Sequence, residues 1–307
     1  MNSANTDTRT PTLILGTVQL GMPYGIANTS GKPERHLARQ IIKTALDNNI
    51  TFFDTAQAYG DSESVLGAIL QDLGVADRVY ITSKVSAALN PLDNRQIDSA
   101  IRDSFKRLGV DHLWCMLLHQ PSWLACWDDG LGSVLQNFHA AGQITRLGIS
   151  LNTVNDAAAA LAHPDMETLQ APCNGWDRRM VDLGFLNAAQ RMGRLCSIRS
   201  IYLQGLLTMT PEAAAAKLPA AWEASVRWWS LASEFGISPK ELAFRYALSL
   251  NAPLVVGAES PEQVAETAQL ANRAPLTPED IHSIAATMNP VLDETIIEPW
   301  RWKVLNA

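Results

Sequence analysis

Short apolar runs alternate along the chain with longer stretches whose apolar residues recur three and four positions apart. The first pattern predicts buried strands, and the second predicts amphipathic helices. The predicted strands cover residues 13–15, 51–53, 79–83, 113–118, 144–149, 168–170, 195–201 and 254–256. The predicted helical stretches cover residues 34–48, 62–73, 97–108, 132–141, 154–162, 183–192, 239–250, 261–272 and 278–288, and a longer Ala- and Trp-rich region covers residues 220–235.

About eight strand–helix units result, and strands of this kind, joined by crossover helices, are typical of a parallel sheet. Eight units predict a closed α/β fold, the (β/α)8 TIM barrel, with extra helices, whereas five to seven units would fit an open, doubly wound sheet. We assign residues 1–307 to one domain, because no low-complexity linker divides the chain. Residues 1–11 are expected to be flexible, and residues 291–307 form a C-terminal tail.

Composition limits what the protein is expected to bind. The 307 residues are 47% hydrophobic and 18% charged, enough for a sizeable core, and the net charge of −7 argues against a nucleic-acid surface. The four cysteines include no CxxC pair, so their spacing predicts neither a disulfide framework nor a zinc site, and we predict no metal. Because the sequence shows no signal peptide and no run of the ~20 apolar residues that span a bilayer, we expect a cytoplasmic protein with no membrane partner.

Ionisable residues follow three consecutive predicted strands. Asp54 comes after the second strand, Lys84 after the third and His119 after the fourth, while Tyr59 follows Asp54 by five positions. Functional groups of a barrel gather at the rim formed by the carboxyl ends of its strands. Taken singly, these residues are typical of a helix cap, a solvated lysine, a turn and a packed phenol. Their combination, in this order, predicts a catalytic site.

The four residue types suit the reduction of a carbonyl group, which needs a hydride at carbon and a proton at oxygen. A tyrosine with an ordinary pKa of about 10 holds its proton tightly at neutral pH, and a nearby ammonium favours the phenolate. Lys84 can supply that ammonium, and Asp54 can keep it charged and oriented. His119 can hydrogen-bond the carbonyl oxygen. We therefore expect Tyr59 to be the proton donor in reduction and the base in oxidation.

These segments resemble the aldo-keto reductase superfamily, from about residue 12 to about residue 290. The resemblance rests on Phe53-Asp54-Thr55-Ala56 with Tyr59-Gly60, on Thr82-Ser83-Lys84 and on Leu118-His119. It implies a catalytic tetrad of Asp54, Tyr59, Lys84 and His119 and a nicotinamide cofactor, NADPH or, less often, NADH. Residues 16–21 resemble the opening segment of the family, which places Gly16 and Thr17 beside the nicotinamide ribose.

The family binds its cofactor without a Rossmann fold, and this chain has no GxGxxG motif after a strand. The resemblance assigns Ser150 and Gln170 to the nicotinamide carboxamide, whose donor and acceptor such a pair can satisfy. It assigns to the pyrophosphate the loop after the seventh strand, with Arg199, Ser200, Gln204, Gly205 and Leu206.

The resemblance assigns the adenosine end of the cofactor to Gly257, Gln263 and Glu266. Some NADPH-binding relatives share the glycine and the glutamine, so NADPH is preferred here over NADH. Glu259 adds negative charge close by.

Variable loops form the substrate pocket in such barrels. Aromatic candidates for covering a small aldehyde, ketone or sugar are Tyr24, Trp123, Trp127, Trp300 and Trp302, and the alternative is that they pack on the barrel exterior or at an oligomer contact. We expect an NAD(P)-dependent oxidoreductase for such substrates. The alternatives are a cofactor-sensing regulatory subunit with little turnover and an isomerase that transfers no hydride. No oligomeric state follows from the sequence.

Overall fold

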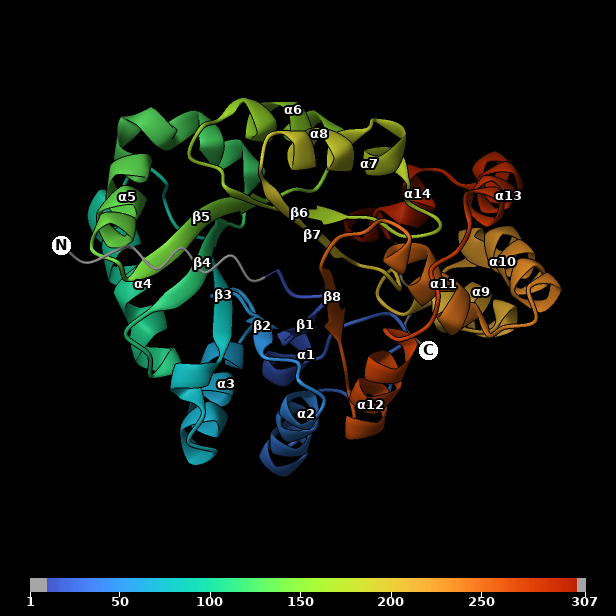
Figure 1. The fold of residues 1–307 in the computed structure, drawn as a ribbon, viewed down its shortest axis with the longest axis horizontal. Coiled ribbons are helices and arrows are strands. Elements are labelled where there is room, and N and C mark those ends of the chain that lie inside the picture. The colour runs from blue at the N-terminus through green and yellow to red at the C-terminus, as the bar shows by residue number, and fades with distance from the viewer. Residues whose placement is uncertain (1–9, 303–307) are drawn as a thin grey trace.

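A computed structural model describes residues 10–302, and its eight strands form a closed parallel barrel (Figure 1). Each strand pairs with the next along the chain, and β8 pairs with β1, where Leu13 lies opposite Leu254. The predicted (β/α)8 barrel is therefore confirmed. The strands are β1 (Leu13–Gly16), β2 (Phe52–Asp54), β3 (Tyr80–Val85), β4 (Leu113–Leu118), β5 (Ile144–Ser150), β6 (Thr168–Pro172), β7 (Leu195–Arg199) and β8 (Leu254–Gly257).

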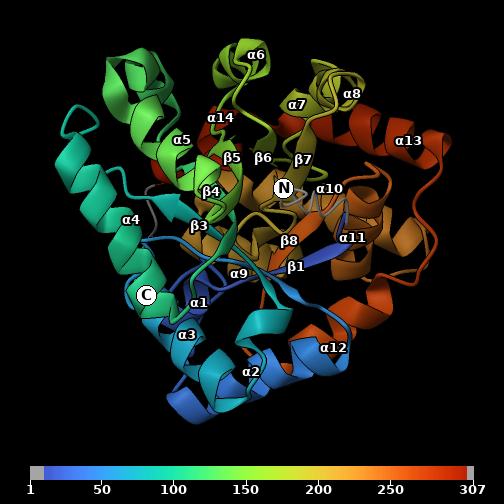
Figure 2. The same cartoon turned by 60° about the vertical axis from the view of Figure 1, so that its left-hand side comes forward.

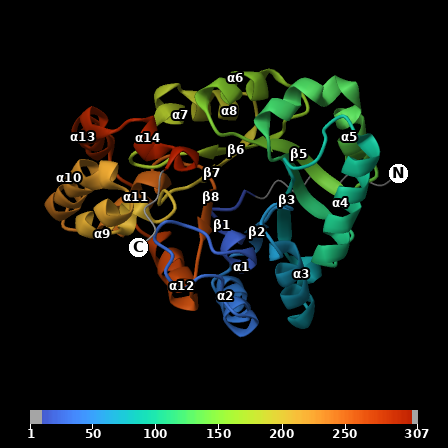
Figure 3. The same ribbon diagram turned by 180° about the vertical axis from the view of Figure 1, so that it is seen from behind.

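Helices surround the barrel, with α2 to α6 following one another around its outside (Figure 2). Helices α9, α10 and α13 lie together on one side (Figure 3). Among residues 10–302, no helix has the length and apolarity that a membrane span requires. The helices are α1 (Val18–Gly21), α2 (Arg35–Asp47), α3 (Ser62–Asp72), α4 (Asn94–Leu108), α5 (Gly132–Ala140), α6 (Val154–Ala162), α7 (Arg179–Asp182), α8 (Phe185–Arg191), α9 (Pro211–Lys217), α10 (Trp222–Glu234), α11 (Pro239–Leu248), α12 (Pro261–Leu270), α13 (Pro278–Met288) and α14 (Glu294–Ile297).

Four helices of the second half begin with the same local signal, a Ser or Thr followed by Pro. Thr210, Ser238, Ser260 and Thr277 each accept a hydrogen bond from the backbone N–H three residues later, and the proline occupies the first helical position. The hydroxyl satisfies one free N–H, and proline loses no bond there because its nitrogen has no hydrogen. Three of these helices, α9, α11 and α12, lie in the connections that follow β7 and β8.

The structure differs from the predicted elements at several places. The predicted helix at 183–192 is α8, which starts at Phe185 after Gly184 at φ +70°, and the short helix α7 before it was not predicted. The seventh strand ends at Arg199 and not at residue 201, because Ser200 takes φ +61° and turns the chain. Helix α9 was not predicted, and the tail forms α14. Of the segment 1–11 that we expect to be flexible, residues 1–9 lie outside the described residues, and the single-domain assignment stays a prediction.

The barrel interior is apolar at one end and polar at the other. Phe52 stacks on Tyr80 at 4.4 Å between ring centroids and meets Trp114 edge-on at 5.2 Å. Asp54 follows Phe52 by two positions and therefore points the same way, because side chains alternate along a strand. Its carboxylate reaches Gln170 of β6 across the interior. The polar end lies at the carboxyl ends of the strands, where the predicted site residues are.

Candidate active site

A buried ion pair joins the ends of β2 and β3. Lys84 Nζ lies 2.5 Å from Asp54 Oδ1 and donates a second hydrogen bond to the Thr55 carbonyl at 3.0 Å, and its side chain has no exposed area. The other carboxylate oxygen of Asp54 accepts a bond from Gln170 Nε2 at 2.8 Å. Burial alone would lower the pKa of Lys84, but the charge of Asp54, then Tyr59 and the hydrogen bonds outweigh it, so that pKa lies above its ordinary value. Lys84 therefore stays charged in a dry site.

Tyr59 brings its phenol to this ammonium. Its hydroxyl lies 3.4 Å from Lys84 Nζ, and its ring meets the His119 ring edge-on at 5.6 Å between centroids. The structure thus brings together all four predicted catalytic residues. Asp54, Tyr59 and His119 line the cavity that is described below, whereas Lys84 lies behind them.

Two glycines hold the Tyr59 loop against α1. A Cβ on Gly21 would lie 1.8 Å from the Tyr59 carbonyl oxygen, so only glycine allows this approach. Gly60 lies at the same contact, against the Gly21 carbonyl, and its φ of +57° is a conformation that favours glycine. Ser62 adds a hydrogen bond to the Thr17 carbonyl at 2.8 Å. The position of the phenol is therefore set by backbone contacts between the loops after β1 and β2.

His119 is a neutral imidazole in this site. Burial, then the charges of Lys84 and Arg199, lower its pKa to about 3. Its Nδ1 is buried and has no hydrogen-bond partner within the described part of the chain. A neutral ring offers one donor and one acceptor, so at ordinary pH His119 can hydrogen-bond an oxygen but carries no positive charge.

This pKa predicts an acid-sensitive fold. The unfolded chain takes up a proton at the ordinary histidine pKa of about 6.5, whereas folded His119 does not until about pH 3. The free energy of unfolding must therefore fall as the pH falls through this window. Between pH 7 and pH 5, His119 accounts for a loss of about 2 kcal/mol. Urea unfolding of wild type and His119→Gln at both pH values measures it. We expect the variant to lose less stability on acidification, and equal losses would contradict the assignment.

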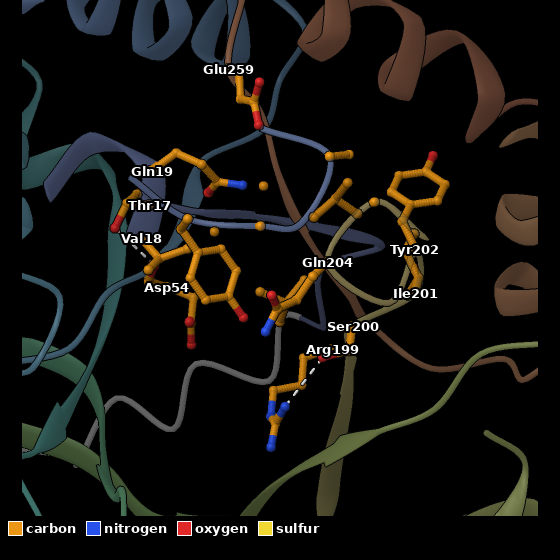
Figure 4. Close-up of a pocket in the computed structure, with 18 of the residues that line it drawn as sticks. Thr17, Val18, Gln19, Asp54, Arg199, Ser200, Ile201, Tyr202, Gln204 and Glu259 are labelled. Carbon is orange, nitrogen blue, oxygen red and sulfur yellow. Dashed lines mark hydrogen bonds between the residues drawn. The ribbon is translucent and has the colours of Figure 1, made fainter. Parts of the chain in front are cut away.

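A cavity of about 550 Å³ extends from the tetrad along the ends of β1, β7 and β8 (Figure 4). Nine of the twelve predicted cofactor residues line it: Gly16, Thr17, Ser150, Arg199, Ser200, Gln204, Gly205, Gly257 and Gln263. Gln170 lies next to it, bonded to Asp54. Leu206 is buried in the core and Glu266 pairs with Lys240, so neither side chain lines the cavity. Their cofactor roles stay predictions.

Arg199 is held by the neighbouring loop. Its guanidinium donates to the Leu151 carbonyl at 2.8 Å and to Asn152 Oδ1 at 2.9 Å. It also donates to Ser200 Oγ at 3.2 Å (Figure 4). The loop after it contains three residues other than glycine with positive φ, namely Ser200, Leu203 and Gln204. Asn152, Gln19, Tyr202 and Lys240 also line the cavity. None of these four was predicted as a site residue: Gln19 and Tyr202 lie inside segments that resemble the family but were given no role, and Asn152 and Lys240 lie outside those segments.

The aromatic residues considered for the substrate pocket separate into two groups. Tyr24 lines the cavity. Trp123 and Trp127 are buried in the hydrophobic core, which contradicts the expectation that they cover a substrate. In the tail, Trp302 donates to the Ile296 carbonyl and Trp300 is exposed, and neither lines the cavity. Ion pairs of Glu298 with Arg179 and Arg301 anchor this tail.

Comparison with protein families gives a match over nearly the whole chain. The model of the aldo/keto reductase family covers residues 12–289. The chain belongs to this family. Its members are NAD(P)H-dependent carbonyl reductases. The predicted family, and with it an oxidoreductase, is confirmed.

Individual aldo-keto reductases match over parts of the chain. YhdN of Bacillus subtilis (strain 168) is 28% identical over 160 residues, 49% of this chain and 47% of that protein. A 6-dehydroglucose reductase of Novosphingobium aromaticivorans is 33% identical over 139 residues, 41% of this chain and 45% of that protein. The matches therefore span about half the length of these curated relatives.

Solved structures match over more of the chain and show the fold. The glycerol dehydrogenase AKR11B4 from Gluconobacter oxydans has a TM-score of 0.73 at 22% identity, over 92% of this chain and 94% of that one. The aldo-keto reductase AKR11C1 from Bacillus halodurans has a TM-score of 0.72 at 21% identity, over 98% of this chain and 99% of that one.

The cavity of this aldo-keto reductase fits a nicotinamide dinucleotide. Buried polar atoms normally have partners, yet four in or beside the cavity have none within residues 10–302: Gln19 Oε1, His119 Nδ1, Gln170 Oε1 and the Tyr202 hydroxyl. A Cβ at Gly257, on the cavity wall, would lie 2.5 Å from Gln19 Nε2, so the glycine allows the Gln19 amide to lie against that wall. The unpartnered polar atoms and the cavity of about 550 Å³ supply the partners and the space that such a ligand requires.

Proposed function

We propose that this chain transfers hydride between a nicotinamide dinucleotide and the carbonyl or alcohol carbon of a small aldehyde, ketone or sugar, with Tyr59 as the proton donor and acceptor. The observation that carries the proposal is the contact of the Tyr59 hydroxyl with the buried Lys84 ammonium, 3.4 Å away. Family membership supports the same chemistry.

The cofactor would be held along the cavity by residues that line it and by Gln170 next to it. Ser150 and Gln170 would bind the carboxamide, the loop of Ser200 and Gln204 the pyrophosphate, and residues near Gly257 and Gln263 the adenosine end. When bound, the nicotinamide supplies or accepts the hydride. Asp54 keeps Lys84 charged, and Lys84 stabilises the negative charge that forms on the Tyr59 oxygen when its proton leaves.

His119 positions the substrate in this proposal. Its uncharged ring lies edge-on to the Tyr59 ring, so a carbonyl oxygen that meets the phenol also lies near the imidazole. A hydrogen bond from the imidazole then holds the oxygen and stabilises charge that develops on it. Because His119 is neutral, Tyr59 remains the group that delivers the proton.

A hydroxylated substrate, such as a sugar, is supported by the polar wall of the cavity. Asn152 presents an amide group there, and an amide can hydrogen-bond a hydroxyl. The 6-dehydroglucose reductase relative carries a sugar substrate in its name. The cytoplasmic location and the lack of nucleic-acid and membrane partners stay predictions, as does the absence of a metal.

Two measurements on the purified protein test the proposal. A fluorescence titration with NADPH and NADH should show saturable binding of at least one of them. Loss of NAD(P)H absorbance should then depend on an added aldehyde, ketone or aldose. Binding of neither nucleotide would contradict the proposal. Tight binding without multiple turnover, over a broad panel of carbonyl compounds, would favour the regulatory alternative.

A further inference from the structure

The cavity has a second end, away from the tetrad, lined by Lys240, Glu259, Gln263 and Thr267. Figure 4 shows Glu259 and Arg199 on opposite sides of the cavity. If the nicotinamide lies beside Tyr59, as the proposed function requires, the pyrophosphate separates it from the adenosine half, which must extend towards this second end. NADH and NADPH differ only there, because the adenosine ribose carries a 2′-hydroxyl in one and a 2′-phosphate in the other.

Glu259 places a carboxylate at this end without a cation to balance it. The side chain is partly buried, and this burial raises its pKa, while a hydrogen bond with Asn28 acts in the opposite direction. Among the described residues 10–302, Glu259 forms no ion pair with a lysine, arginine or histidine. A phosphate beside Glu259 would bring a second negative charge to surroundings whose burial already disfavours the charged carboxylate.

The cation that lines this end is already paired. Lys240 forms an ion pair with Glu266 of α12 and lies 6.0 Å from the centroid of the Tyr202 ring. For Lys240 to bind a phosphate, it would have to leave Glu266. The Glu266 carboxylate therefore offsets part of the positive charge that Lys240 could offer to a 2′-phosphate.

The amino end of α12 offers little to an anion, because its donors are used within the turn. The Gln263 backbone N–H donates to Ser260 Oγ, and Pro261 has no N–H. The Glu262 carboxylate accepts from the Ser260 hydroxyl and from its own backbone N–H. The Glu259 N–H donates to Gln263 Oε1 at 2.8 Å. Helix amino ends bind phosphate through free N–H groups, and here the N–H groups of Glu259, Glu262 and Gln263 are occupied.

We infer that this end of the cavity selects NADH over NADPH, and that Glu259 is the specificity-determining residue. Its carboxylate accepts a hydrogen bond from a ribose hydroxyl and repels a phosphate in the same place. The inference rests on the proposed function and opposes the NADPH preference predicted from Gly257 and Gln263. Because one repulsive contact of this kind commonly changes binding by a factor of ten or more, we expect NADH to bind at least about tenfold more tightly.

Equilibrium binding tests this inference without any turnover. Fluorescence titrations give the Kd of NADH and of NADPH for wild type, Glu259→Gln and Glu259→Arg. The ratio of the two Kd values should shrink in Glu259→Gln and invert in Glu259→Arg. Glu266→Gln should tighten NADPH alone, because it releases Lys240. Glu279→Gln is the control for net charge. It removes one negative charge at the exposed start of α13 and should change neither Kd.

The outcomes separate the inference from the function on which it rests. If wild type binds NADPH as tightly as NADH or more tightly, the selectivity is wrong and the proposed function stands. If Glu279→Gln shifts NADPH binding as much as Glu259→Gln does, the effect is one of net charge and the role of Glu259 is wrong. If neither nucleotide binds, the proposed function itself fails.

Discussion

Replacing Tyr59 with phenylalanine is expected to lower kcat for carbonyl reduction by about 10²- to 10⁴-fold, the usual contribution of a positioned acid. The substitution removes only the oxygen that lies 3.4 Å from Lys84 Nζ and keeps the ring that packs against His119. The Kd of the cofactor should change little, because the ring fills the same volume. Steady-state rates at saturating cofactor and fluorescence titration measure the two effects separately.

Tyr24 provides a matched control on the wall of the same cavity. Its side chain is partly exposed, burial raises the pKa of the phenol, and its hydroxyl bonds to Gln204, whereas Lys84 bonds to Tyr59. Tyr24→Phe should therefore change KM more than kcat. If Tyr59→Phe kept the wild-type rate, or if Tyr24→Phe lost as much of kcat, the assignment of the proton donor would be wrong.

The barrel and the tetrad were predictable because both depend on one regularity. A parallel strand followed by a helix directs every strand end to one rim, so polar residues that end the apolar runs converge without further information. Asp54, Lys84 and His119 are such residues. Tyr59 reaches the same place through a loop of five positions, and the glycine contact that fixes it, Gly21 against the Tyr59 carbonyl, involves residues that only the fold brings together.

Other features were not predictable, because they depend on contacts between distant segments. The bonds of Arg199 lie in the loop after β5, 47 and 48 positions away. The positive φ of Ser200 and Gln204 leaves no trace in residue type. Trp123 and Trp127 follow β4 directly, yet the chain folds them into the core. The charge balance near Glu259 likewise required the position of Lys240, which a sequence pattern does not give.

Replacing Lys84 with methionine is expected to lower the free energy of unfolding by about 3–5 kcal/mol, as for other buried ion pairs that lose one member. Methionine fills similar space, but it leaves the Asp54 carboxylate almost fully buried with only the Gln170 amide bonded to it. Lys43→Met is the matched control, because Lys43 pairs with Asp47 at 2.6 Å on an exposed helix face. Exposed pairs contribute about 0–1 kcal/mol.

Unfolding at two pH values and a second substitution identify why Lys84→Met loses stability. Protonation of Asp54 removes the unpaired charge, so the deficit of Lys84→Met relative to wild type should be smaller at pH 4 than at pH 7. Asp54→Asn combined with Lys84→Met should recover much of the stability, since no buried charge remains. Urea unfolding of the three variants at both pH values measures these differences. A deficit that is independent of pH and is kept in the double variant would mean that lost packing, not the carboxylate, destabilises the fold. The ion pair would then hold Lys84 beside Tyr59 for catalysis without contributing to stability.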